Sequence, residues 1–149
     1  MGFDYFVGEL RCPACGKVTA ADGQPNIQTK IRDEAELAYL GIGARVDTSA
    51  RNMERSDYLE LRAPGGGELR VLQTWECPYC STPFNWAEIV IRDGEIRGVS
   101  AVPMTPKTLA TAHYMHEFDA GILAAQTTGR PSDDFARREL LDIIRGLAG

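Results

Sequence analysis

The sequence lacks long apolar runs and most of the groups from which catalytic sites are usually built. No apolar stretch approaches the roughly 18 to 20 residues that a membrane-spanning helix needs. There are only two histidines in 149 residues, and no serine, cysteine or carboxylate pair stands at a recognisable spacing from a base that could activate it. We therefore expect no membrane span and predict that the protein is not an enzyme.

Basic residues are also too few for a typical nucleic-acid-binding surface. The 16 lysines and arginines are outnumbered by 21 acidic residues, which gives a formal net charge of −5. Tight binding to a phosphate backbone needs a concentrated basic face. One group of closely spaced arginines is interspersed with acidic residues, a pattern typical of a solvated face of mixed charge: Arg45, Asp47, Arg51, Glu54, Arg55 and Asp57. Nucleic acid is therefore the weaker candidate partner.

The chain begins with MGFDYFVGEL, which has no basic segment ahead of an apolar stretch, and Phe6 stands where a myristoylation signal requires serine or threonine. The composition, 44% hydrophobic and 25% charged, is that of a soluble globular protein. A chain of 149 residues can form one domain with its own core. We expect a cytoplasmic protein with a single domain over residues 1–149, mainly β in residues 1–103 and helical in residues 104–149.

The first hundred residues contain several strand patterns. Residues 4–12 and 26–32 are rich in β-branched and aromatic residues or alternate apolar with polar ones. Residues 58–76 have the pattern of a hairpin around the turn sequence PGGG, and its second strand leads to a cysteine pair. Residues 86–102 contain Asp93-Gly94 between two strand patterns, a strong two-residue hairpin signal. The sheet is therefore predicted to be mainly antiparallel.

Short helical signals interrupt and follow these strands. Residues 33–40 are predicted to form a helix that ends at Gly41, and residues 45–57 a surface loop. Thr105 can cap a helix whose first residue is Pro106 and which runs to about Glu117.

A last helix is predicted to begin near Ser132, because apolar residues then recur on one face: Ala136, Leu140, Ile143, Ile144 and Leu147. This face is expected to pack inside the molecule. The predicted fold class is α+β, an antiparallel β-sheet with a four-cysteine site and C-terminal helices packed on the sheet.

All four cysteines stand in two CxxC pairs, and none is left over: Cys12, Cys15, Cys77 and Cys80. The second pair reads CPYC, which is also the active-site sequence of glutaredoxins. Such enzymes need one pair only, placed where a strand ends and a helix begins. Here Pro83 and a strand pattern follow Cys80, so a thiol oxidoreductase is the less favoured alternative.

A metal site uses all four residues. Two intervening residues allow both thiolates of a pair to bind one tetrahedral ion, and two pairs complete the Cys₄ set of a structural zinc site. Cys12-Pro13-Ala14-Cys15-Gly16 resembles the CPxCG knuckle of zinc-ribbon proteins, and Cys77-Pro78-Tyr79-Cys80-Ser81 resembles it with serine in the glycine position. The resemblance implies one Zn²⁺ ion held by the four cysteines. It covers the two knuckles and their strands, and no specific family is identified.

The two pairs are unusually far apart for a zinc ribbon, with 61 residues between Cys15 and Cys77. Closing a loop of this length costs on the order of 3 to 4 kcal/mol, whereas structural zinc contributes roughly 10 to 16 kcal/mol in peptide systems. The spacing is therefore compatible with a single site. Iron in a rubredoxin-like Cys₄ site is the alternative metal. Four protein ligands leave no open coordination position, which indicates a structural site.

Two further groups are candidates for function. His113, His116 and Glu117 would share one face of the helix predicted for residues 106–117, where they could form a second site or simply make local hydrogen bonds. Four aromatic residues surround the second cysteine pair, more than a small zinc site needs for cover, and exposed members would suit a protein contact: Trp75, Tyr79, Phe84 and Trp86.

The sequence thus predicts a non-catalytic, zinc-stabilised domain that recognises another protein, as adaptors and immunity-type proteins do. The alternatives are a zinc-ribbon module that binds nucleic acid or takes part in transcription, and the CPYC thiol oxidoreductase.

Overall fold

The computed structural model describes residues 3–21 and 27–149. Its elements, in chain order, are β1 (Asp4–Phe6), β2 (Ile27–Thr29), β3 (Tyr39–Leu40), α1 (Ala50–Arg55), β4 (Tyr58–Glu60), β5 (Glu68–Trp75), β6 (Asn85–Arg92), β7 (Glu95–Val102), α2 (Pro106–Thr111), β8 (Tyr114–His116), α3 (Glu117–Thr128) and α4 (Arg137–Leu147). They form a small sheet of order β2-β1-β3 and a larger sheet of order β4-β8-β5-β6-β7. The predicted α+β class is confirmed.

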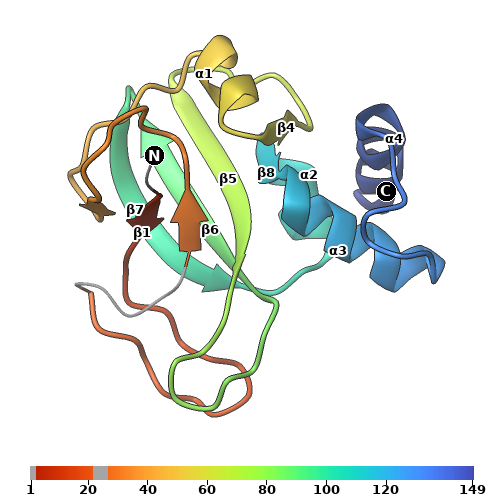
Figure 1. Cartoon of the computed structure of the whole chain (residues 1–149), viewed down its shortest axis with the longest axis horizontal. Helices are drawn as coiled ribbons and strands as arrows, with labels where there is room; N and C mark the ends of the chain where they lie inside the picture. The colour runs from red at the N-terminus through yellow and green to blue at the C-terminus, as the bar shows by residue number, and fades with distance from the viewer. Residues whose placement is uncertain (1–2, 22–26) are drawn as a thin grey trace.

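Three of the five strands of the larger sheet, β5, β6 and β7, form an antiparallel meander (Figure 1). The hairpin predicted at Asp93-Gly94 is present, and both turn residues have the positive φ that a two-residue hairpin turn requires. The β5–β6 connection, residues 76–84, carries the second cysteine pair. The strand that leads to Cys77 is therefore as predicted.

The predicted hairpin over residues 58–76 is wrong. Strand β8 lies between β4 and β5, antiparallel to β4 and parallel to β5. The apolar side chains of Tyr114 and Met115 are buried there, and this burial favours the insertion of β8 over direct β4–β5 pairing. The sheets are consequently mixed and not purely antiparallel, but four of the six strand pairings are antiparallel, so the prediction of mainly antiparallel pairing is confirmed.

Strand β1 organises the small sheet, antiparallel to β2 and parallel to β3. The strands expected over residues 4–12 and 26–32 shorten to three residues each, and Asn26 lies outside the described residues. The helix predicted over residues 33–40 is wrong. Residues 33–37 are exposed, and β1 binds the end of the segment instead, with the Tyr5 N–H donating to the Ala38 carbonyl at 3.1 Å.

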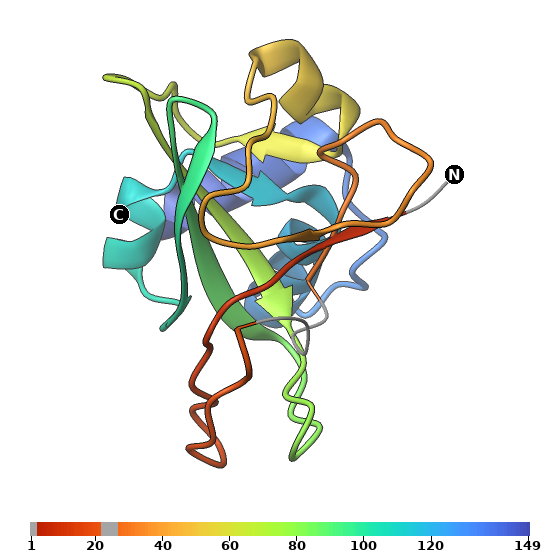
Figure 2. The ribbon, with the colours of Figure 1, turned by 90° about the vertical axis from the view of Figure 1, so that its left-hand side faces the viewer.

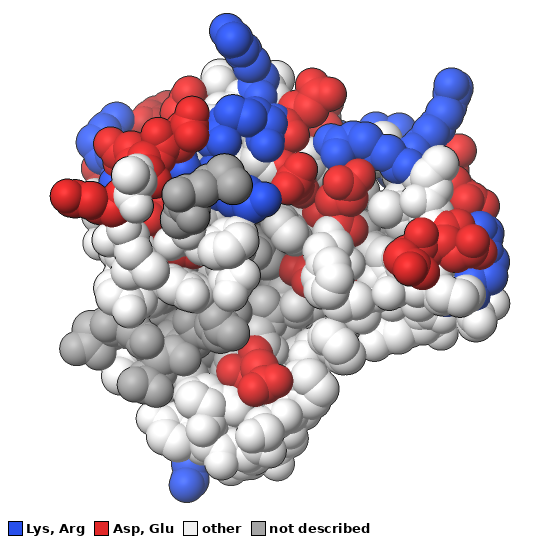
Figure 3. Space-filling view, in the orientation of Figure 1, with Lys and Arg blue, Asp and Glu red and all other residues white. Residues whose placement is uncertain are grey.

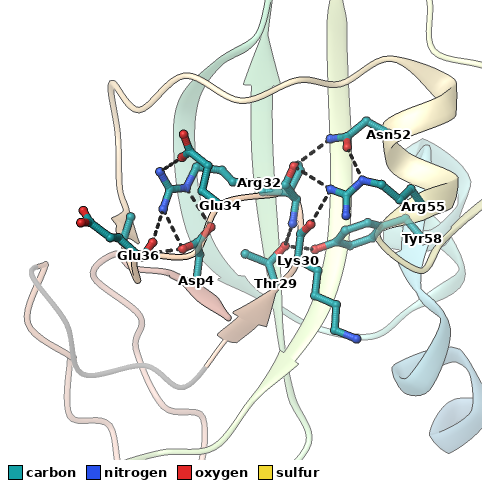
Figure 4. A network of polar contacts seen from close by, with 11 residues as sticks. Asp4, Thr29, Lys30, Arg32, Glu34, Glu36, Asn52, Arg55 and Tyr58 are labelled. Carbon is teal, nitrogen blue, oxygen red and sulfur yellow. Dashed lines mark hydrogen bonds and ion pairs between the residues drawn. The ribbon is translucent and has the colours of Figure 1, made fainter. Parts of the chain in front are cut away.

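Polar side chains fix the small sheet to its surroundings (Figure 4). The guanidinium of Arg32 donates to both oxygens of the Asp4 carboxylate, at 2.8 and 3.0 Å, and contacts Glu34. From α1, Asn52 donates to the Ile31 carbonyl at 2.8 Å, and Arg55 donates to the Lys30 carbonyl at 2.7 Å. The chain that follows β2 is therefore held from both sides.

Helix α1 replaces the surface loop predicted for residues 45–57. Ser49 caps it, since its hydroxyl accepts the Asn52 N–H at 3.3 Å, and Met53 is fully buried. The serine cap was a usable sequence signal. Met53 is the only buried apolar residue of α1, so the sequence shows no helical periodicity there that would support the cap signal.

The C-terminal helices differ from expectation in their boundaries. Thr105 caps α2 and Pro106 is its first residue, as predicted, but the helix ends at Thr111 and the chain becomes strand β8. Helix α3 was not predicted. Helix α4 begins at Arg137 rather than near Ser132, and its buried Leu140 and Ile144 confirm that its apolar face packs inside the molecule.

The larger sheet is covered on both faces (Figures 1 and 2). Neighbouring residues of β5 point to opposite sides: Val71 belongs to a buried cluster shared with the small sheet, and Leu72 to one shared with the helices. None of the helices within residues 3–21 and 27–149 is long and apolar enough to cross a lipid bilayer. The two cysteine-bearing loops project together from the lower end of this sandwich in Figure 2.

Candidate metal centre

The first knuckle is a tight turn over residues 12–17. The Cys12 N–H donates to the Lys17 carbonyl and the Gly16 N–H donates to the Cys12 carbonyl, both at 2.9 Å. Gly16 has a positive φ of 76°, a conformation that glycine adopts without steric cost. Below the turn, the Thr19 hydroxyl accepts the Leu10 N–H and donates to the Gly8 carbonyl, at 2.9 and 2.8 Å, which closes the base of the loop.

The second knuckle repeats this geometry. The Cys77 N–H donates to the Thr82 carbonyl at 3.1 Å, and the Ser81 N–H donates to the Cys77 carbonyl at 2.9 Å. Ser81, at the position equivalent to Gly16, has a φ of 61°. The knuckle therefore forms despite the serine, at the conformational cost that a side chain carries in the left-handed region.

Replacing Ser81 with glycine is expected to stabilise the protein by about 0.5 to 1 kcal/mol, because relief of the left-handed strain exceeds the entropy that glycine loses on folding. Urea denaturation of the metal-loaded protein measures the change. Gly16→Ala is the matched variant, since no atom lies within 4 Å of the added Cβ and only the backbone conformation opposes it. It should destabilise by a similar amount, and a loss of stability in Ser81→Gly would contradict the interpretation.

The knuckles bring the four sulfur atoms together. The Cys12 and Cys80 Sγ atoms are 3.7 Å apart, as are those of Cys15 and Cys77, and all four lie within 4.8 Å of one another. A tetrahedron with metal–sulfur arms of about 2.3 Å has edges of about 3.8 Å. The thiols are free, and the first cysteine of each pair is buried while the second is exposed. The donor set and spacing fit one tetrahedral metal ion.

Backbone and hydroxyl groups also point at the sulfurs. The Ala14 N–H donates to the Cys12 Sγ at 3.4 Å. The Thr82 hydroxyl lies 3.1 Å from the Cys80 Sγ, and this contact, together with the Thr82 backbone N–H, lowers the pKa of Cys80 to about 6. Such contacts stabilise thiolate charge and orient the ligands.

The surroundings of Cys15 act in the opposite direction on its pKa. A backbone N–H of Lys17 favours the Cys15 thiolate, but burial and the sulfurs of Cys77, Cys80 and Cys12 together raise the pKa of Cys15 to about 11. A divalent cation at the centre would offset the mutual repulsion of four thiolates. The chemistry of the cluster thus favours a bound metal.

The aromatic residues around the second knuckle divide into two kinds. Trp75 and Trp86 are core residues, 2% and 7% exposed, and the Trp75 indole N–H donates to the Trp86 carbonyl at 3.2 Å. Tyr79 and Phe84 are 49% and 47% exposed, and the Lys17 ammonium lies 5.3 Å from the centre of the Tyr79 ring. Of these four aromatic residues, only Tyr79 and Phe84 can therefore serve as an exposed contact surface.

The two histidines do not share a helix face, which corrects the sequence prediction. His113 precedes β8, and its Nδ1 accepts the Arg70 N–H at 2.9 Å. His116 ends β8 and Glu117 begins α3. Within the described part of the chain, only the four cysteines form a group suited to a metal ion.

The residues that sequence reasoning missed at the centre are Thr19 and Thr82. Each supports a knuckle through its hydroxyl, but a threonine beside a cysteine carries no distinctive sequence signal.

The CPYC pair is followed by strand β6, not by a helix. The structure therefore lacks, after Cys80, the helix N-terminus that activates the thiol in glutaredoxin-type enzymes.

Comparison of the chain with protein-family models, curated proteins and solved structures finds no match. What the geometry defines is an α+β protein with a four-cysteine cluster compatible with a zinc-ribbon-like site.

Proposed function

We propose that this protein is a non-catalytic, zinc-stabilised protein-recognition domain in which Cys12, Cys15, Cys77 and Cys80 hold one structural Zn²⁺ ion. The observation that carries the proposal is the position of two exposed aromatic rings, Tyr79 and Phe84, beside four sulfurs at tetrahedral spacing. When bound, zinc would supply no reaction chemistry. It would fix the two knuckles and the rings beside them.

The closed donor set supports a structural role. Four protein thiolates saturate a tetrahedral zinc ion, so no position remains for water or substrate. Zinc is preferred over iron because a rubredoxin-type electron carrier is normally a much smaller chain whose metal site is nearly its whole content.

The surface near the knuckles supports protein contact. Figure 3 shows charged side chains gathered over the upper part of this face and few over the lower lobe, where the cysteine loops project in Figure 1. Half-exposed aromatic rings at such a place are typical anchors of protein interfaces. The proposed partner is a protein with an apolar pocket that takes one of these rings. Adaptor and immunity-type proteins use such surfaces, and this chain is compared with them by analogy between classes of protein.

Site-specific photo-crosslinking in the native cell tests this surface. A photoreactive residue at Tyr79 or Phe84 is expected to capture a defined protein, whereas the same residue at exposed Lys107 on α2 should not. The captured protein, purified and titrated with the chain, should bind at least about tenfold more weakly to Tyr79→Ala or Phe84→Ala. Equal capture at all three positions, or unchanged affinity of both variants, would overturn the proposal.

The two alternatives make distinct predictions. A nucleic-acid-binding module would show affinity for mixed nucleic acids that falls steeply between two salt concentrations. A thiol oxidoreductase would reduce insulin disulfides in its metal-free form. The net charge of −5 weighs against the nucleic-acid-binding module. The strand that follows Cys80 weighs against the thiol oxidoreductase.

A further inference from the structure

A cavity of about 440 Å³ lies away from the cysteine cluster, between β2, β5 and the start of α3. Its volume is within the range of small-molecule sites, roughly 300 to 1,000 Å³. No cysteine lines it, and its lining combines a lysine, two aspartates, a histidine and two phenylalanines. These residues come from several segments of the chain, and the proposed function assigns no role to them.

One side of the cavity is built around a fixed carboxylate. Asp119, in the first turn of α3, is only 4% exposed. Its two oxygens accept the Thr74 backbone N–H at 2.8 Å and the Thr74 hydroxyl at 2.7 Å. Both bonds come from the same residue of β5, so the carboxylate has a defined position and retains lone pairs for a further donor.

A histidine stands beside this carboxylate. His116 immediately precedes α3, and its ring makes an edge-on contact with Tyr58, with centroids 5.4 Å apart. Within residues 3–21 and 27–149 its imidazole makes no hydrogen bond, and burial lowers its pKa, which keeps the ring neutral at pH 7. A neutral imidazole can accept a hydrogen bond from an ammonium group.

Another part of the lining carries a positive charge. The Lys30 ammonium is 3.9 Å from the Asp57 carboxylate and 5.4 Å from the centre of the Phe3 ring. Both partners of the ion pair are nearly half exposed, so the pair is weak and its lysine is available to a ligand. The backbone of Lys30 is held by Arg55 (Figure 4). A ligand would therefore reorder only the flexible end of the side chain.

Two other polar residues of the lining, Thr29 and Gln73, are already paired inside the protein. The Tyr58 hydroxyl donates to Gln73 Oε1 at 2.8 Å and lies 2.8 Å from the Thr29 hydroxyl, and the Gln73 amide also contacts the Gln28 carbonyl. At the same cavity, the side chains of Phe3 and Phe118 are exposed. A matching ligand therefore needs one negative group, one positive group and an apolar part.

We infer that this cavity binds a free α-amino acid with a large apolar side chain. The ligand's carboxylate pairs with Lys30, its ammonium group pairs with Asp119 and donates to His116, and its side chain covers the rings of Phe118 and Phe3. A phosphate ester fits poorly, because two aspartates line the cavity. A simple amine makes no contact with Lys30, which then keeps only its weak, half-exposed pair with Asp57. The inference does not depend on the proposed function of the knuckles.

NMR titration of the full, metal-loaded chain with phenylalanine and with leucine tests the site. We expect saturable amide shifts at residues 28–30, 73–74 and 116–119. N-acetylphenylalanine, which lacks the ammonium group, and phenylalanine amide, which lacks the carboxylate, should each bind at least about tenfold more weakly. Inorganic phosphate and agmatine, which carries an ammonium and a guanidinium group but no carboxylate, are the probes for the other ligand classes.

Two variants assign the contacts without disturbing the core. Lys30→Gln should weaken phenylalanine binding about tenfold and remove the preference for phenylalanine over phenylalanine amide. Phe118→Ala should weaken the binding of both phenylalanine and phenylalanine amide. Lys107→Gln, the same change on an exposed lysine of α2, should have no effect. The inference is overturned if neither amino acid binds at about 10 mM. It is equally overturned if phosphate or agmatine binds more tightly than phenylalanine, or if Lys30→Gln binds phenylalanine with the affinity of the parent protein.

Discussion

Replacing Cys77 with serine is expected to abolish metal binding and to lower the free energy of unfolding by more than about 4 kcal/mol. Structural zinc contributes roughly 10 to 16 kcal/mol in peptide systems, and part of this offsets the cost, on the order of 3 to 4 kcal/mol, of closing the long loop between the cysteine pairs. Cys77 is fully buried, and its sulfur lies 3.7 Å from that of Cys15. Urea denaturation followed by tryptophan fluorescence measures the loss.

Ala14→Ser is the control for that experiment. Ala14 is exposed in the first knuckle and contributes only its backbone N–H to the cluster, so the variant should retain the metal and its stability. A strong chelator should shift the parent's denaturation curve toward that of Cys77→Ser and leave the variant's own curve unchanged. Equal stability of Cys77→Ser and the parent would show that the cysteines do not hold a structural ion.

Replacing Trp75 with alanine is expected to cost about 3 to 5 kcal/mol, the usual range for removing a large aromatic side chain from a core. Trp75 is among the largest fully buried side chains, it belongs to the cluster beneath the small sheet, and it stands two residues before Cys77. The substitution leaves a cavity at the base of the second knuckle. Thermal and urea denaturation measure the loss.

Phe84→Ala is the matched control for Trp75→Ala, because Phe84 is another aromatic residue of the same segment but is 47% exposed. Its cost should stay below about 1 kcal/mol. A loss in Phe84→Ala as large as that in Trp75→Ala would contradict the division of this aromatic group into core residues and contact residues. In that case Phe84 would be a structural residue and a poor candidate for the partner surface.

Features with short-range signals could be predicted from the sequence. The Asp93-Gly94 turn needs only two residues with positive φ between strand patterns, and the start of α2 needs only a threonine cap followed by proline. The cysteine pairs are equally local, since each knuckle closes through hydrogen bonds within about six residues. Their convergence was inferred from ligand number, and the structure brings the four sulfurs together.

Features that depend on distant partners could not be predicted in this way. Residues 33–40 have the composition of a helix, but the last two residues, Tyr39 and Leu40, pair with β1, which lies more than thirty residues earlier in the chain. Likewise β4 and β5 are separated by β8, which comes about forty residues later in the chain and buries Met115 between them. Sequence pattern indicates which segments can be extended, but not which of them pair.

The cavity beside α3 shows the same limit for function. Lys30, Thr74 and Asp119 stand at least forty residues apart, and none belongs to a recognisable motif. Sequence reasoning selected His116 for its helical spacing to His113, whereas the structure places it next to a buried aspartate on a different element.

Metal analysis of the unmodified protein tests the central claim most directly. Native mass spectrometry and elemental analysis of material purified without chelators should find one zinc ion per chain, bound with loss of thiol protons and absent from Cys77→Ser. Material that contains no stoichiometric metal while its four thiols remain reduced, or that contains iron in place of zinc, would contradict the account.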